Sequence, residues 1–261
     1  MSATTLTSPI PMDLRVAHRR PALGRLVTVE LRKILGTRAG FWMQVATVAL
    51  TAIVVIGRLV SADAADRTFS DVLTVALKPA AVLLPVAGIL LVTSEWSQRT
   101  GMITFALIPR RSRIVGAKLI AAVVLAFAML AVCIGIAAAG VLGASPDIDG
   151  VWTDATTLIA QSSVYIVGGM VTGVAFGMVL LASAPALVAL FGLPSAWAAL
   201  LFLPVFGDVG RWLDTGRSLS PMTQEVLTGT QWAQAGTSLA LWMLLPLLIG
   251  TWRITRREIA A

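Results

Sequence analysis

Residues 114–143 read IVGAKLIAAVVLAFAMLAVCIGIAAAGVLG, and Lys118 is the one charged residue in that run. A helix needs roughly 20 mostly apolar residues to cross about 30 Å of hydrocarbon, so the run is long enough to span a bilayer at a tilt. Its apolar side chains occupy every helical face. The stretch therefore predicts a membrane-spanning helix and an all-α fold whose solvent is lipid.

Five further runs meet the same criterion of length and apolar character. The six predicted spans are about 41–60, 73–94, 114–143, 156–181, 186–206 and 237–252. Residues 182–185 alone separate the fourth from the fifth, which predicts a tight helical hairpin there. We interpret 22–252 as a single transmembrane domain between an N-terminal tail, 1–21, and a C-terminal tail, 253–261.

Charged residues are scarce and unevenly placed. They make up 13% of a chain that is 57% hydrophobic, whereas a soluble domain usually has about 25%. The loops on one side hold nine of the 13 acidic residues, and the other side holds most of the basic ones. By the positive-inside rule both termini are expected in the cytoplasm, and the protein in the cell membrane. The net charge of +7 then reflects topology, not nucleic-acid binding. The basic residues on the predicted inner side are Arg15, Arg19, Arg20, Arg25, Arg32, Lys33, Arg38, Arg99, Arg110, Arg111, Arg113, Lys118, Arg253, Arg256 and Arg257.

Two segments outside the spans have apolar residues at informative spacing. Residues 22–38 predict an amphipathic helix on the cytoplasmic membrane surface, with Leu23, Leu31 and Ile34 on its apolar face. It is either a plain anchor or part of a partner-binding surface. Residues 207–236 mix tryptophans with charges and glycines, which predicts short interfacial or re-entrant helices on the outer side.

Gly169, Gly173 and Gly177 recur at four-residue spacing in the fourth predicted span. Such a stripe lets another helix backbone approach closely. It predicts helix packing, either within the chain or at a subunit interface or pathway wall.

Motifs for catalysis and for nucleotide binding are missing from the sequence. It contains no GxxxxGK[ST] motif, one histidine, His18, and one cysteine, Cys133. A P-loop, a Ser-His protease centre and an HExxH metal site are therefore excluded. We expect a chain that is not an enzyme and that holds no cofactor or metal of its own.

The segment between the second and third spans, residues 94–113, reads SEWSQRTGMITFALIPRRSR. A short helix there, parallel to the membrane, would act as a lever because it is joined to two long spans. A basic loop that merely sets topology would have the same composition. Both interpretations stay open on composition alone.

The same segment resembles the acidic-aromatic…Thr-Gly-x-Ile…Pro-x-Arg…Lys pattern of type-2 ABC transporter permeases. The matching residues are Glu95-Trp96, Thr100-Gly101-Met102-Ile103, Pro109-Arg110-Arg111 and Ala117-Lys118. Residues 30–33, ELRK, look like the amphipathic connecting helix of that family. The resemblance extends to chain length and to the layout of the six spans.

By that resemblance, residues 94–113 contain a coupling helix that docks on a separate ATPase subunit, and ATP and magnesium would bind there. It also implies a second permease chain, identical or different, and export of an amphipathic or hydrophobic substrate, with membrane lipid as surroundings. The resemblance assigns Glu95, Trp96, Arg99, Thr100, Gly101 and Ile103 to the ATPase-coupling helix, and Arg110, Arg111 and Arg113 to a lipid-headgroup anchor.

Two other kinds of membrane protein fit the same span pattern. A secondary transporter acting alone needs a buried ionisable group, and Lys78 is the candidate that the sequence offers unless it snorkels to the outer surface. A non-transporting scaffold or immunity protein would have no ATPase partner. Neither the substrate nor the identity of a second chain follows from the sequence.

Overall fold

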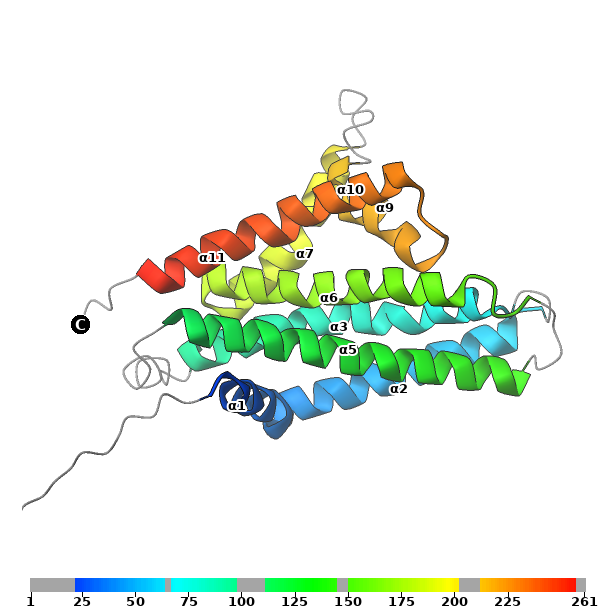
Figure 1. Cartoon of the computed structure of the whole chain (residues 1–261), viewed down its shortest axis with the longest axis horizontal. Coiled ribbons are helices and arrows are strands. Elements are labelled where there is room, and N and C mark those ends of the chain that lie inside the picture. The colour runs from blue at the N-terminus through cyan, green and yellow to red at the C-terminus, as the bar shows by residue number, and fades with distance from the viewer. Residues whose placement is uncertain (1–21, 64–66, 98–110, 145–149, 202–211, 257–261) are drawn as a thin grey trace, which may run out of the picture.

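A computed structural model of the chain describes residues 22–63, 67–97, 111–144, 150–201 and 212–256. Regular secondary structure in these ranges is helical throughout, and six helices are long and apolar enough to cross a membrane (Figure 1). The chain is an all-α polytopic membrane protein, as the run at residues 114–143 predicts.

The helices run back and forth along the bundle, so that the described N-terminal and C-terminal helices reach the same end (Figure 1). Between the fifth and sixth spans lie two short helices, α9 (Thr215–Leu219) and η3 (Ser220–Thr223). The amphipathic helix α1 (Leu23–Gly36) precedes the spans. The spans are α2 (Arg38–Ser61), α3 (Phe69–Ser97), α5 (Arg111–Ala144), α6 (Ala155–Leu180), α7 (Ser183–Leu200), and a last helix made of α10 (Gly229–Leu239), the π-helical turn η4 (Ala240–Leu244) and α11 (Leu245–Arg256).

Two boundaries differ from those predicted. The hairpin between α6 and α7 turns at Leu181, whose φ of 57° is left-handed, and α7 already begins at Ser183. Pro185 is compatible with this early start because proline is tolerated in the first turn of a helix. The last span begins at Gly229, well before the predicted residue 237, because a capping box between Thr228 and Gln231 starts the helix there. Of the predicted fifth span, residues 202–206 lie outside the described residues.

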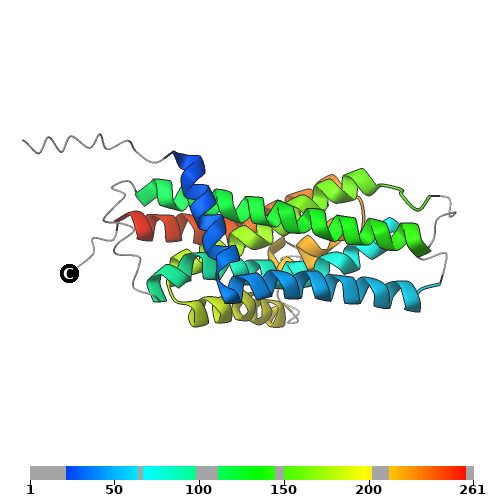
Figure 2. The ribbon, with the colours of Figure 1, turned by 90° about the horizontal axis from the view of Figure 1, so that it is seen from below.

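The amphipathic helix α1 lies crosswise over one end of the bundle (Figure 2). Thr37 separates it from α2, and its hydroxyl accepts a hydrogen bond from the Gly40 amide at 3.1 Å. A Cβ at position 40 would come within 1.9 Å of the Ile34 carbonyl oxygen, so only glycine allows this sharp elbow. The inward face of α1 packs on α2, α3 and α5 instead of lying only on a membrane surface.

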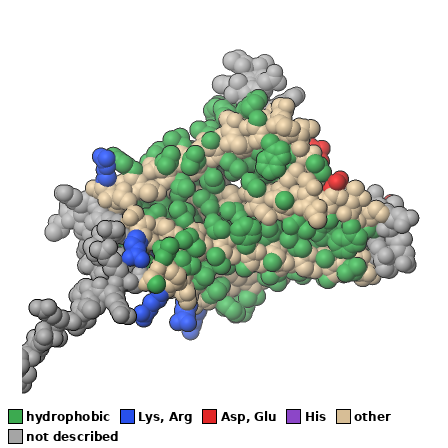
Figure 3. All heavy atoms as spheres, in the orientation of Figure 1, with side chains coloured by type: hydrophobic (Ala, Val, Ile, Leu, Met, Phe, Trp, Pro, Cys, Tyr) green, Lys and Arg blue, Asp and Glu red, His purple; other side chains and the backbone are tan. Residues whose placement is uncertain are grey.

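Apolar side chains face outward along the length of the bundle (Figure 3). Val60 on α2 and Val188 on α7 are 79% and 72% exposed, and Trp252 on α11 is 60% exposed. Basic side chains gather at the end that carries α1, and acidic side chains lie toward the other end (Figure 3). An apolar middle between polar ends is the surface expected of a protein in a bilayer.

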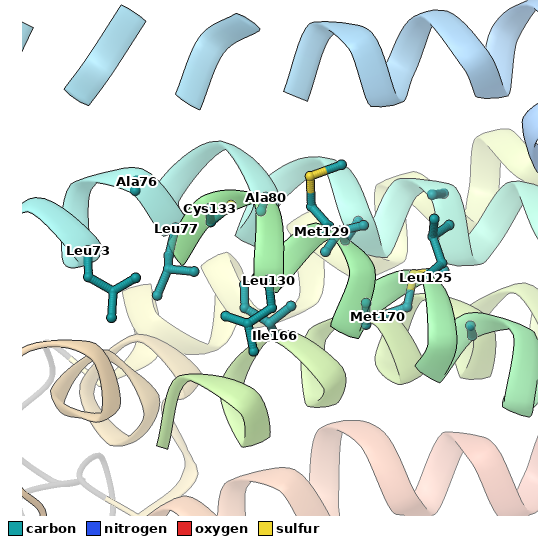
Figure 4. Packing of buried hydrophobic residues seen from close by; sticks show 14 of the residues in the cluster. Leu73, Ala76, Leu77, Ala80, Leu125, Met129, Leu130, Cys133, Ile166 and Met170 are labelled. Atoms are coloured by element: carbon teal, nitrogen blue, oxygen red, sulfur yellow. The ribbon is translucent and has the colours of Figure 1, made fainter. Parts of the chain in front are cut away.

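The core is centred on α3 and α6, each of which has 56% of its most apolar window buried, compared with 22% in α2 and 11% in α7. Leu73 and Leu77 of α3 meet Leu130 of α5 and Ile166 of α6 in one hydrophobic cluster (Figure 4). Lipid tails are as apolar as leucine, so close packing, not water exclusion, holds such helices together.

The segment between α7 and α10 is hydrogen-bonded to α6 through the side chain of Gln161. The Gln161 amide nitrogen donates to the carbonyl oxygens of Met222 (3.2 Å) and Glu225 (2.8 Å), and its oxygen accepts from the Leu227 amide (2.9 Å). The short helices predicted within residues 207–236 are confirmed by α9 and η3. Gln161 of α6 helps to hold the segment that follows them through these hydrogen bonds.

Candidate functional site

Four charged side chains meet where α1 crosses the ends of α3 and α5; we call them the charge cluster. Glu30 and Lys33 come from α1, Glu95 from the last turn of α3, and Lys118 from α5, two turns after it begins. Glu30 and Lys33 are three residues apart and therefore share one face of their helix. That face is turned toward the bundle, so three elements distant in sequence are joined by charge.

Each ammonium group of the charge cluster bridges the two carboxylates. Lys33 Nζ lies 2.9 Å from Glu30 Oε1 and 2.5 Å from Glu95 Oε1. Lys118 Nζ lies 2.7 Å from Glu30 Oε2 and 3.1 Å from Glu95 Oε1, and it also donates to the Leu91 carbonyl oxygen at 3.1 Å. The result is a closed ring of four ion pairs with charge-assisted hydrogen bonds.

Three of the four residues of the charge cluster are buried. Glu30 and Glu95 are each 5% exposed and Lys118 is 4% exposed, whereas the Lys33 side chain remains 39% exposed. Two carboxylates and two ammonium groups sum to no net charge, which is the condition under which buried charges are tolerated. Lys33 closes the cluster on its solvent-facing side.

The pKa of Lys33 is affected more by its two carboxylate partners together than by its burial. Burial alone would lower the pKa of its ammonium group, but hydrogen bonds and charge attraction from Glu95 and Glu30 raise the pKa above its ordinary value. Lys33 therefore stays protonated at neutral pH, and its contribution weakens only when the pH rises above about 10.4, the ordinary value for lysine.

The charge cluster holds three helices together, because each charged side chain needs its partners to remain stable when buried. We call this arrangement the clamp. Removing one partner of a buried ion pair typically costs about 3–5 kcal/mol, since an uncompensated charge stays behind. Glu95 lies two residues before the end of α3, and Lys118 lies seven residues after the start of α5. The clamp therefore ties α1 to both helices that flank residues 98–110.

The residues assigned to the ATPase-coupling helix fall into two groups. The Glu95 carboxylate is buried and bound to Lys33 and Lys118 of its own chain, and its role in coupling to an ATPase stays a prediction. Trp96 is in the last turn of α3. Arg99, Thr100, Gly101 and Ile103 lie outside the described residues, and their coupling role stays a prediction.

The lipid-headgroup anchor also stays a prediction. Arg110 lies outside the described residues, Arg111 begins α5, and the half-buried Arg113 is in the first turn of that helix. The start of α5, which holds Arg111 and Arg113, lies at the end of the bundle that carries α1, and this is compatible with headgroup contact.

The glycine stripe on α6 faces α3 of the same chain. A Cβ at position 173 would come within 1.9 Å of the Pro85 carbonyl oxygen, and one at position 177 within 3.2 Å of the Ile89 carbonyl oxygen. Position 169 lies against the Pro85 ring, at 3.5 Å. Of the two roles open for the stripe, the structure places it in packing within the chain.

Two members of the charge cluster, Glu30 and Lys118, are buried ionisable groups that sequence reasoning missed. In the sequence, Lys118 has the appearance of one more basic residue of the inner side, and Glu30 that of part of the ELRK motif. A single lysine inside an apolar run, with an acid and a base spaced three residues apart on a nearby amphipathic helix, was the available signal. Lys78, the lysine considered for a lone transporter, is exposed.

A scan against protein-family models finds none that matches this chain, and a search of curated proteins also finds no match. Support for a function therefore comes from the charge cluster and from the motifs in the sequence.

Proposed function

We propose that this chain is the permease subunit of an ATP-driven exporter. It would work with a separate ATPase subunit, which binds ATP and magnesium, and with a second permease chain. The substrate class would be amphipathic or hydrophobic, because the bundle is apolar and its spans contain few charged groups.

The charge cluster is the observation that carries this proposal. A push on residues 98–110 acts on the end of α3 and the start of α5, and both are clamped to α1 through Glu95, Glu30 and Lys118. The three helices would then move as one body, which is what a transmission element between an ATPase and a membrane pathway requires. The sequence contains no P-loop, which is consistent with ATP hydrolysis on another polypeptide.

The charge distribution supports an orientation with this end in the cytoplasm. Basic side chains surround α1 and the end of α11, and acidic residues are concentrated at the opposite end (Figure 3). Under the positive-inside rule both termini are cytoplasmic in the cell membrane, where residues 98–110 can meet a cytoplasmic ATPase.

The proposal is tested by purifying the tagged full-length chain from native membranes and measuring associated ATPase activity. Membrane vesicles should also show ATP-dependent efflux of an amphipathic dye. Arg99→Glu, in the predicted coupling helix, should lower both activities. The matched control is Asp63→Lys, a charge change of the same size at an exposed position at the opposite end.

An equal response of Arg99→Glu and Asp63→Lys would remove the coupling role from residues 98–110. Purification without ATPase activity, together with vesicles that transport only under an ion gradient, would favour a secondary transporter. Absence of ATPase activity and of any transport would favour a scaffold.

A further inference from the structure

A cavity of about 150 Å³ lies midway along the bundle, away from the charge cluster. It is lined by residues of α3, α6, α7, α9 and the last span, and Figure 3 shows a gap in the surface above α6 in this region. Tyr165, Phe176, Phe191 and Trp242 supply aromatic walls, and among the described residues none that line the cavity is charged. An apolar cavity of this size can hold a benzene-sized ring.

The cavity has one buried polar group that nothing in the described structure satisfies. The Ser238 side chain, on α10, is fully buried, and its Oγ has no hydrogen-bond partner among the described residues. A buried hydroxyl without a partner loses the free energy of a hydrogen bond to water. Ser238 therefore offers a donor and an acceptor to whatever enters the cavity.

Proline positions add further acceptors beside the same cavity. Proline has no amide hydrogen, so the carbonyl four residues before it lacks its usual helical donor. Pro85 has this effect on Ala81 in α3, and Pro194 has it on Leu190 in α7. These four residues all line the cavity, which brings together two weakened helical hydrogen-bond ladders from different helices.

The last span is also irregular at this point. Its π-helical turn, residues 240–244, includes Trp242, and Pro246 removes the usual donor to the Trp242 carbonyl. The indole N–H of Trp242 is already used, since it donates to the Leu213 carbonyl oxygen at 2.8 Å. This hydrogen bond constrains the orientation of the Trp242 side chain, which lines the cavity. π-helical turns are frequent at functional sites.

We propose that this cavity binds the apolar ring of a neutral molecule that also carries a hydroxyl or amide hydrogen-bond donor. The ring lies among the aromatic walls, and the polar group pairs with Ser238 and with the acceptors beside Pro85 and Pro194. Charged groups are disfavoured because the lining holds no counter-charge.

This chemistry can come from a small transported molecule or from a neutral lipid whose polar end is a hydroxylated ring, such as a long-chain alkylphenol. If the occupant is the transported molecule, the cavity is a substrate-binding site, and that role rests on the proposed function. Binding itself is independent of any ATPase, so it can be measured on the isolated chain. Failure of binding and failure of the transport proposal are therefore distinguishable.

The test uses the trifluoromethyl-diazirine derivative of benzyl alcohol as a photolabel on the full-length chain in nanodiscs. Labelled peptides are mapped by mass spectrometry, and excess benzyl alcohol is the competitor. We expect saturable labelling on α6 or on the last span. Gly169→Leu, which adds a side chain to the lining, should reduce it to background, whereas Gly135→Leu, at an exposed position on α5, should not.

Ser238→Ala tests the polar contact separately. It should weaken apparent affinity for the alcohol about three- to tenfold, the value of one hydrogen bond. The matching toluene diazirine, which lacks the hydroxyl, should label wild-type protein and Ser238→Ala equally. If Gly169→Leu does not fold, Phe191→Trp enlarges a lining side chain that is 44% exposed and should also reduce labelling.

Stronger competition by 3-pentadecylphenol than by benzyl alcohol would identify the natural occupant as a neutral lipid with a hydroxylated ring. Competition by benzyl alcohol alone would identify a small molecule. Labelling that is unsaturable, or unchanged in both Gly169→Leu and Phe191→Trp, would overturn the proposal, and so would a charged benzoate diazirine that labels as well as the alcohol.

Discussion

Gly173 is the residue at which α3 and α6 come closest, and its hydrogen side chain is a packing requirement. Gly173→Ala would place a methyl group 1.9 Å from the Pro85 carbonyl oxygen and 2.6 Å from the Pro85 carbonyl carbon. These are backbone atoms, so the two helices must separate. We expect a loss of about 1–3 kcal/mol of stability, typical of overpacking, measured by thermal unfolding in detergent.

Gly135→Ala is the control for Gly173→Ala, because a Cβ at position 135 meets nothing within 4 Å. It should change stability by less than about 0.5 kcal/mol. Equal melting temperatures for the two variants would contradict the close contact between α3 and α6.

Lys118 is the buried lysine of the charge cluster, and its removal leaves the two carboxylates with a surplus negative charge. Lys118→Met keeps the apolar length of the side chain but leaves Glu30 and Glu95 with Lys33 as their remaining lysine in the cluster. We expect a loss of about 3–5 kcal/mol, measured by unfolding in detergent. Adding Glu30→Gln to Lys118→Met should recover part of that loss, because it removes the surplus negative charge.

Lys78→Met, at an exposed lysine, is the control for Lys118→Met and should leave stability within about 0.5 kcal/mol of wild type. If the double variant is no more stable than Lys118→Met alone, then charge imbalance is not the cause of the loss.

At the scale of elements, the Gln161 side chain joins the segment between α7 and α10 to α6 by hydrogen bonds. Gln161→Leu removes hydrogen bonds to Met222, Glu225 and Leu227 and leaves their backbone groups without that partner. We expect faster amide hydrogen exchange within residues 219–228, measured in nanodiscs, because local opening costs less without these bonds. Exchange in α3 and α5 should be unchanged.

Ser163→Ala, two residues further along α6, is the control for Gln161→Leu. The Ser163 hydroxyl donates only to the Ile159 carbonyl oxygen of its own helix, at 2.8 Å. Equal amide hydrogen exchange of residues 219–228 in the two variants would show that Gln161 does not hold this segment.

The helical elements were predictable because lipid imposes a strict minimum on span length and apolar character. The α2, α3, α5 and α6 bounds lie within four residues of the predicted spans. The start of α10 was missed because a capping box at Thr228 and Gln231 extends the helix through polar residues that hydropathy scores as loop. Hydropathy alone does not weigh such local hydrogen bonds.

At the scale of the whole molecule, the sequence predicted the bundle but not the charge cluster. Each member has an ordinary local explanation: Glu30 and Lys33 as a helical pair, Glu95 at a span end, Lys118 as a topogenic base. Their meeting depends on how α1 crosses α3 and α5, which is set by the elbow at Gly40 and by packing. Hydropathy and charge counts contain no such pairwise information, so the lone Lys118 in an apolar run signals a buried partner but does not identify it.

Orientation is the whole-molecule property on which the proposed function depends. Cys133 is buried, so wild-type protein should resist a membrane-impermeant maleimide, and Cys133→Ala provides a cysteine-free background. In that background, Asp63→Cys should be labelled in intact cells. Arg25→Cys and Arg256→Cys, at exposed positions at the opposite end, should be labelled only after permeabilisation. This pattern follows because basic segments stay inside while acidic loops cross the membrane.

The reverse labelling pattern would place residues 98–110 outside the cell, beyond the reach of a cytoplasmic ATPase, and the exporter proposal would fail. Labelling of Arg25→Cys and Arg256→Cys from opposite sides would instead contradict an even number of spans. Since α1 and the end of α11 lie at the same end of the bundle, we expect these two positions to respond together in every condition (Figure 1). Their shared response would place the charge cluster on the side where ATP is available.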